Sequence, residues 1–122
     1  MDYSRGIQVL EEMLGKEEAR EVCDAWEEVH PDLEHYIVGF LAGEVWARPG
    51  LERKIKSLCT ITALAALGRR EALALNIRMA LKNGARKEEI FEALLHIAPY
   101  AGFPAAWESL LMARKILGSL KD

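Results

Sequence analysis

Residues 58–67 read LCTITALAAL, a run of ten residues without a single charge. Its apolar side chains fall on nearly every side of a helix instead of forming one stripe, and a helix of that kind is buried all round. We therefore expect the helix that contains it, from Leu51 to Gly68, to lie at the centre of a bundle or beneath a subunit interface. In either place Cys59 would be a small buried residue.

The segments on both sides of this run also have helical spacing, and none alternates with the period of two that marks a strand. Apolar periodicity predicts helices over about residues 4–14, 17–29, 31–43, 71–83, 87–98 and 104–118. Glycine ends several of them and proline begins or breaks others. The Pro49-Gly50 turn makes residues 44–51 a connector. We therefore predict an all-α fold, a single-domain bundle of about six or seven helices over residues 1–122.

Composition and charge exclude several classes of function. The chain has 16 Lys and Arg against 19 Asp and Glu, a net charge of -3, and so lacks the basic surface of a nucleic-acid-binding protein. No apolar run reaches the roughly 20 residues of a membrane span, and the charged N-terminus does not resemble a signal peptide. Cys23 and Cys59 are too few and too far apart for a disulfide framework. We expect a soluble cytoplasmic protein with buried, unreactive thiols.

Sequence motifs for metal, serine or phosphate chemistry are missing. His30, His35 and His96 do not stand at metal-ligand spacing from other ligands, so no metal site is predicted, and the first two are expected to face solvent. No serine occupies a G-x-S-x-G turn and no glycine-rich phosphate loop is present. What remains is a small number of polar residues on or beside apolar helix faces.

Asn76 is the first of these residues, because it lies on the predicted inward face of residues 71–83. A buried amide needs a hydrogen-bond partner, which is either a neighbouring helix or subunit or a bound ligand. A second group, Glu92, His96 and Tyr100, shares one helical side at spacings of four. His96 can move a proton near neutral pH, although a solvated or interface histidine is an equally good interpretation.

The third group, Glu44, Trp46 and Arg48, lies on the connector. Arg48 can clamp a carboxylate through two parallel hydrogen bonds, because its guanidinium group matches the geometry of that anion. The alternative is a cap or salt bridge that fixes the connector.

Five segments form a larger pattern when they are taken in order. They are W-x-R-P-G-L at 46–51, L-x-T-I-x-A-L-A-A-L-G at 58–68, A-L-x-N-G at 80–84, E-E-I-x-E-x-L-L-H at 88–96 and Y-x-G-x-P-A-A at 100–106. Their order and spacing, over more than half of the chain, resemble the carboxymuconolactone decarboxylase family. By this resemblance residues 44–122 are the family core, and residues 1–43 are similar to the helices that precede it in decarboxylase-type members.

The resemblance implies the all-helical fold of alkyl hydroperoxidase D and a homo-oligomer, typically a hexamer built as a trimer of dimers. Family peroxidases use a CxxC pair, and here no second cysteine stands three residues from Cys59, which disfavours thiol-dependent peroxidase activity. Family decarboxylases remove carbon dioxide from an unsaturated carboxylated lactone in aromatic-compound breakdown. The resemblance therefore implies a decarboxylase that takes a small carboxylated substrate and uses no cofactor.

The chain departs from the family pattern at two positions. Ser57 follows Lys56 where many members have glutamate, and Asn76 stands where they have histidine. Decarboxylation leaves an enolate that must be protonated at carbon, which a histidine can do and a neutral amide cannot. The same departures leave open a second function, an oligomeric binding or assembly protein that has lost the chemistry.

Candidate site residues follow from the resemblance together with residue type. The candidates for the catalytic proton donor are His96 and Glu44, and those for substrate binding are Arg48, Lys56, Asn76, Tyr100 and Trp46. Among the second set, the two cations would hold substrate carboxylates and the amide would hydrogen-bond a carbonyl or developing oxyanion.

Overall fold

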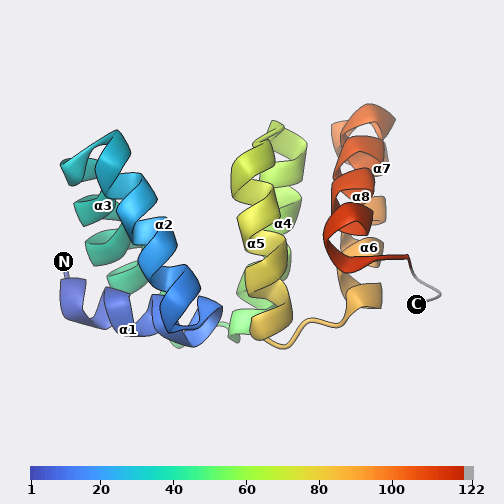
Figure 1. Ribbon diagram of the computed structural model, residues 1–122. Coiled ribbons are helices and arrows are strands. Elements are labelled where there is room, and N and C mark those ends of the chain that lie inside the picture. Colours follow the sequence, from blue (N-terminus) through green and yellow to red (C-terminus); the bar gives the residue numbers. More distant parts are fainter. Residues whose placement is uncertain (120–122) are drawn as a thin grey trace. The chain divides into compact units, whose positions relative to one another are not determined.

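The computed structural model describes residues 1–119 and shows a chain of helices (Figure 1). No strand occurs in this range, so the predicted all-α fold is confirmed. The chain divides into two compact units, Met1–Glu52 and Arg53–Asp122, here called unit 1 and unit 2. Among the helices of residues 1–119, none combines the length and apolar character that crossing a membrane requires.

Unit 1 consists of α1 (Tyr3–Leu14), α2 (Lys16–Val29), α3 (Pro31–Tyr36) and the π-helical segment η1 (Ile37–Trp46). Helix α1 packs against both α2 and η1. Its buried side chains recur at helical spacing, because one apolar stripe of α1 faces the inside of the unit. The largest buried apolar side chains of the unit are Val9, Leu10, Met13, Leu14, Val38 and Trp46.

Two glycines allow η1 to lie very close to α1 and the residue that precedes it. A Cβ atom on Gly6 would collide with the backbone of Val38, and one on Gly43 would collide with the backbone of Asp2. At the same crossing the Asp2 N–H donates to the carbonyl of Gly39 at 3.0 Å. The prediction that a helix ends at Gly43 is therefore wrong: the glycine serves a close approach inside η1, not a helix end.

Unit 2 consists of α4 (Arg53–Leu67), α5 (Arg70–Lys82), α6 (Lys87–His96), α7 (Ala98–Ala101) and α8 (Phe103–Leu117). Gly68, with φ at 73°, makes the turn between α4 and α5, a conformation that glycine adopts without strain. The core of the unit draws on α4, α5, α6 and α8, and its largest fully buried residues include Ile61, Ile77, Ile90 and Leu94.

The apolar helix α4 is buried on one side only. Ser57, Ile61 and Ala65, at spacings of four, are buried, and α5, α6 and α8 contact α4. Side chains on other sides of the helix are exposed, namely Cys59, Ala63, Ala66 and Leu67. The expected position at the centre of a bundle, and the expectation that Cys59 is a core residue, are therefore wrong for this chain.

Candidate active site

Glu44, Trp46 and Arg48 lie at the end of η1 and in the segment that follows it. The Glu44 carboxylate pairs with the N-terminal ammonium group at 2.9 Å, and this contact raises the pKa of that amino group above its usual 8.0. Trp46 is buried, whereas Glu44 and Arg48 are exposed. Only the two charged residues of this group can therefore offer a polar side chain to a ligand of unit 1.

His96 and Tyr100 are brought together at the junction of α6 and α7. Their ring centroids lie 5.6 Å apart with the ring planes tilted at 45°, a favourable aromatic geometry. Both side chains are exposed, Tyr100 to 81%. Glu92, one turn earlier on α6, is exposed as well. The imidazole is therefore accessible and held beside a phenol, an arrangement that suits a proton donor.

Asn76 is half-buried, and its side-chain amide bonds within its own helix. Its Nδ2 donates to the backbone carbonyl of Ala72 at 2.8 Å. Lys56, the other predicted substrate-binding residue of α4 and α5, is also half-buried. An amide NH₂ group carries two N–H bonds, so the contact with Ala72 leaves Asn76 a second donor.

A different asparagine, Asn83, connects α5 to α4. Asn83, the C-cap residue of α5, donates from Nδ2 to the Ser57 hydroxyl of α4 at 2.9 Å, and Ser57 is 1% exposed. Sequence reasoning treated Asn83 only as a helix-end signal. The contact could have been predicted from Ser57, because it is the single polar residue in the buried stripe of α4 and a buried hydroxyl needs a partner. The end of α5, which is antiparallel to α4, lies level with it.

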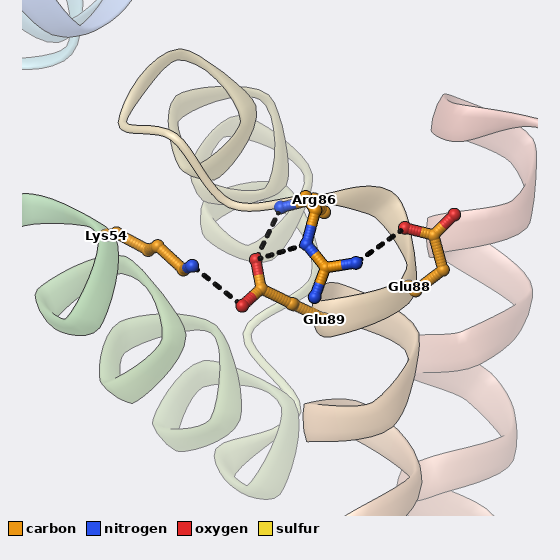
Figure 2. Close-up of polar contacts among 4 residues, drawn as sticks. All are labelled: Lys54, Arg86, Glu88 and Glu89. Atoms are coloured by element: carbon orange, nitrogen blue, oxygen red, sulfur yellow. Dashed lines mark hydrogen bonds and ion pairs between the residues drawn. The ribbon is translucent and has the colours of Figure 1, made fainter.

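A charged cluster joins the start of α4 to the start of α6 (Figure 2). Glu89 accepts from the Arg86 backbone N–H at 2.8 Å, and its other oxygen lies 2.8 Å from Lys54 Nζ. Both contacts, the backbone hydrogen bond first, lower the pKa of Glu89. Arg86 also reaches Glu88 at 3.7 Å. Glu89 thereby caps α6 and fixes it to α4, which is a structural role.

Unit 2 contains a cavity of about 370 Å³ beside the turn between α4 and α5. Its apolar wall includes Leu64, Leu73 and Met112, and its charged lining consists of Arg69, Arg70 and Glu108. The volume lies within the range of small-molecule sites. Sequence reasoning missed the two arginines, although two adjacent cations directly after the apolar helix were a visible signal.

A second hollow of about 400 Å³ lies between α6 and α8 in the same unit. Glu92, one of the residues singled out from the sequence, lines it together with Leu95, Trp107 and Arg114. His96, Tyr100 and Asn76 line neither of these two hollows.

Unit 1 has a cavity of about 560 Å³ whose lining includes Cys23. Burial, followed by the charges of Glu34, Asp24 and Glu11, raises the pKa of the Cys23 thiol to about 11. A thiol with so high a pKa is almost entirely protonated at neutral pH and is a poor nucleophile. The prediction that Cys23 is unreactive agrees with this environment, although its side chain is only partly buried.

Glu34, a buried carboxylate beside this cavity's thiol, was not singled out from the sequence. It accepts a hydrogen bond from the Tyr3 hydroxyl, which raises the pKa of Tyr3 to about 12. His35 stacks on the Tyr3 ring at a centroid distance of 5.9 Å. His30 and His35 are both exposed, as predicted, and no group of three or more His, Cys, Asp or Glu side chains suited to a metal ion occurs among residues 1–119.

Comparison with known proteins identifies the family. The model of the carboxymuconolactone decarboxylase family matches residues 31–115. A 4-carboxymuconolactone decarboxylase of Acinetobacter baylyi is 37% identical over 118 residues, which cover 97% of this chain and 88% of that protein. The nitrosuccinic acid decarboxylase npaB of Metarhizium robertsii is 34% identical over 121 residues, covering 98% of this chain and 84% of that protein. The chain therefore belongs to the carboxymuconolactone decarboxylase family.

Proposed function

We propose that this protein is a decarboxylase that acts on a small carboxylated compound, a lactone acid in the first instance, without a cofactor. The observation that carries the proposal is the 37% identity to a 4-carboxymuconolactone decarboxylase across 97% of the chain. A second relative of nearly full coverage is also named as a decarboxylase of a small acid.

The reaction requires the protein to stabilise a developing negative charge and to deliver a proton. The bond between the carboxylate carbon and its neighbour breaks, carbon dioxide leaves, and the electron pair spreads onto the conjugated carbonyl as an enolate. Donors positioned at the enolate oxygen stabilise the charge, and an acid then delivers a proton to carbon. The second N–H of Asn76 can serve as such a donor, because an amide can stabilise an oxyanion even though it cannot supply the proton.

His96 is our first candidate for the proton donor, since it is accessible and its ring is held beside Tyr100. Glu44 is the second candidate. Its carboxylate is held by an ion pair with the N-terminal ammonium group, and it is 45% exposed. In unit 1 we propose Arg48 as the cation for a substrate carboxylate and Trp46 as a second binding residue, and in unit 2 we propose Lys56 and Tyr100 for the same roles.

The test is carbon dioxide release from 4-carboxymuconolactone by the wild type and four variants. We expect turnover by the wild type and a fall of about 100-fold or more in kcat for His96→Asn, since general acid catalysis contributes that much. His30→Asn is the matched control: it removes another exposed histidine but keeps a side chain that can cap α3. Full turnover by both His96→Asn and Glu44→Gln would refute the proposed proton donors.

Asn76→His completes the set and separates the remaining outcomes. Activity in Asn76→His alone would mean that the chain keeps the substrate site and has lost its acid. If neither the wild type nor Asn76→His released carbon dioxide, the proposal that the protein decarboxylates this lactone would be overturned. An oligomeric binding or assembly protein would then be favoured.

We also propose that the protein is a cytoplasmic homo-oligomer, specifically a hexamer built as a trimer of dimers. The exposed side of the apolar helix α4 supports an interface, as does Trp107 on α8, which is 70% exposed. Light scattering measures the mass directly. A particle of 13.7 kDa, the mass of one chain, would refute the proposal, and Trp107→Glu should lower the mass if α8 lies in the interface.

A further inference from the structure

The cavity beside the turn between α4 and α5 combines apolar walls with two guanidinium groups. Leu73, which is buried, and Leu64 and Met112, which are partly buried, supply apolar lining, and Arg69 and Arg70 are exposed side chains of the same lining. Small-ligand sites have this composition, with few charged groups set in an apolar surround. A volume of about 370 Å³ lies near the lower end of their range and favours a small ligand.

The backbone fixes the two arginines at this position. The N–H of Arg69 donates to the carbonyl of Leu64 at 3.0 Å, and the carbonyl of Arg69 accepts from the N–H of Leu73 at 2.9 Å. Arg70 is the first residue of α5, whose N-cap makes no side-chain hydrogen bond to the helix. The helix dipole at this end adds to the positive potential of the two side chains.

Glu108 of α8 is the carboxylate that shares this lining. Its Oε1 lies 3.9 Å from Arg70 Nη1, and the two side chains are 60% and 69% exposed. A pair at this distance and exposure is weak, so a ligand carboxylate can take the place of Glu108. With one carboxylate against two guanidinium groups, the charged lining keeps a net positive charge.

We infer that this cavity is a binding subsite for a small dicarboxylate, with one carboxylate on Arg69 and the other on Arg70 and the carbon skeleton against the apolar wall. Arginine binds carboxylates through paired hydrogen bonds, which makes two adjacent arginines selective for two carboxylates over one. None of the residues proposed above for the reaction lines this cavity, so the subsite is separate from them and its ligand is a dicarboxylate bound outside the reacting site. The substrates named in the two relatives, 4-carboxymuconolactone and nitrosuccinic acid, each contain two carboxyl groups.

The test uses succinate, a dicarboxylate that cannot undergo the proposed reaction, as the probe. Titration followed by ¹H–¹⁵N NMR gives the Kd and shows which backbone amides shift. For the wild type we expect the shifts to centre on residues 68–70. Arg69→Gln and Arg70→Gln should each raise the Kd about threefold, because an ion pair of exposed side chains contributes a factor of that size. Butyrate, with one carboxylate, should bind about threefold more weakly than succinate.

Two variants serve as controls in the same titration. Arg78→Gln removes an exposed cation from α5 outside the cavity and should leave the Kd unchanged, which separates a local site from the general charge of the helix. Glu108→Gln should bind succinate at least as tightly as the wild type, because it removes the competing carboxylate. Spectra that retain the wild-type dispersion show that each variant is folded.

The outcomes of this test and of the activity test are separable. No succinate binding by the wild type, equal Kd values for all the arginine variants, or shifts centred elsewhere would overturn the subsite. Loss of succinate binding in Arg69→Gln and Arg70→Gln would uphold the subsite even if no carbon dioxide were released from the lactone. Conversely, turnover of the lactone by a wild type that does not bind succinate at this cavity would uphold the decarboxylase and overturn the subsite.

Discussion

The hydrogen bond from Asn83 to Ser57 should stabilise unit 2, and its removal has an asymmetric cost. In Asn83→Ala the Ser57 hydroxyl, 1% exposed, loses its partner at 2.9 Å and stays buried. An unsatisfied buried hydroxyl costs about 1–3 kcal/mol, so we expect a loss of about 2 kcal/mol in the free energy of unfolding. In Ser57→Ala the group left over is the half-buried Asn83 amide, which water can reach, and we expect about 1 kcal/mol or less.

The assay is urea unfolding followed by circular dichroism for the wild type, both single variants and the double variant, at one protein concentration. The double-mutant cycle should give a coupling energy of about 1 kcal/mol. Ser109→Ala is the matched control, because Ser109 is equally buried but its hydroxyl donates only to carbonyls of its own helix, Ala105 and Ala106. We expect a change within about 0.5 kcal/mol for the control.

The reasoning would be refuted by either of two results. A coupling energy near zero would show that the contact between the helices contributes nothing to stability. A larger loss for Ser57→Ala than for Asn83→Ala would show that the packing of the serine, and not its hydrogen bond, decides the energy.

Two further predictions concern unit 1 and the thiols. Gly43→Ala should lower the melting temperature clearly, because the new Cβ collides with the Asp2 backbone. Gly50→Ala is the control and should leave the melting temperature unchanged, because a Cβ there meets nothing within 4 Å. Equal melting temperatures of the two variants would contradict this account. Iodoacetamide at pH 8 should modify Cys23 much more slowly in the folded chain than in the urea-unfolded chain, since burial raises the pKa of its thiol to about 11 and leaves little thiolate. Mass spectrometry of peptides reports the extent of labelling, and equal rates in the folded and unfolded chains would refute the prediction.

Most of the helices could be predicted from the sequence, because the helical period and the turn residues are local signals. Gly15, Gly68 and Gly118 end helices with positive φ, as expected from their positions. Gly43 could not be read in the same way. A glycine that ends a helix and one that admits a neighbouring backbone look alike in a sequence, and only the crossing of α1 and η1 separates them.

The burial of α4 shows a second limit of sequence reasoning. Uniform apolar composition predicts that every side of a helix is buried. It does not distinguish burial by other helices of the same chain from burial by a second subunit. In this chain α5, α6 and α8 cover only the side that contains Ile61, and Cys59 is exposed. The alternative that the sequence left open, a subunit interface, is the one we propose.

For the candidate site, the sequence supplied residue types but not their partners. His96 and Tyr100 were expected on one side of a single helix; they lie on α6 and α7, although their rings remain close, at a centroid distance of 5.6 Å. Asn76 was expected to bond a neighbouring helix, subunit or ligand, and its side-chain amide instead donates to the carbonyl of Ala72, four residues earlier. The contacts of Asn83 with Ser57 and of Glu34 with Tyr3 join residues 26 and 31 positions apart, a separation that periodicity cannot bridge.

The close crossing of α1 and η1 has a consequence for where this protein can be cut. The match to the family model begins at residue 31, so it includes η1 and leaves out α1. A shortened chain that began there would turn Val38, Ala42 and the two glycines of η1 toward water, on a segment with a single charged residue. Such a surface promotes aggregation. The start of the family match thus falls inside unit 1, and the residues before it can be what keeps the matched part in solution.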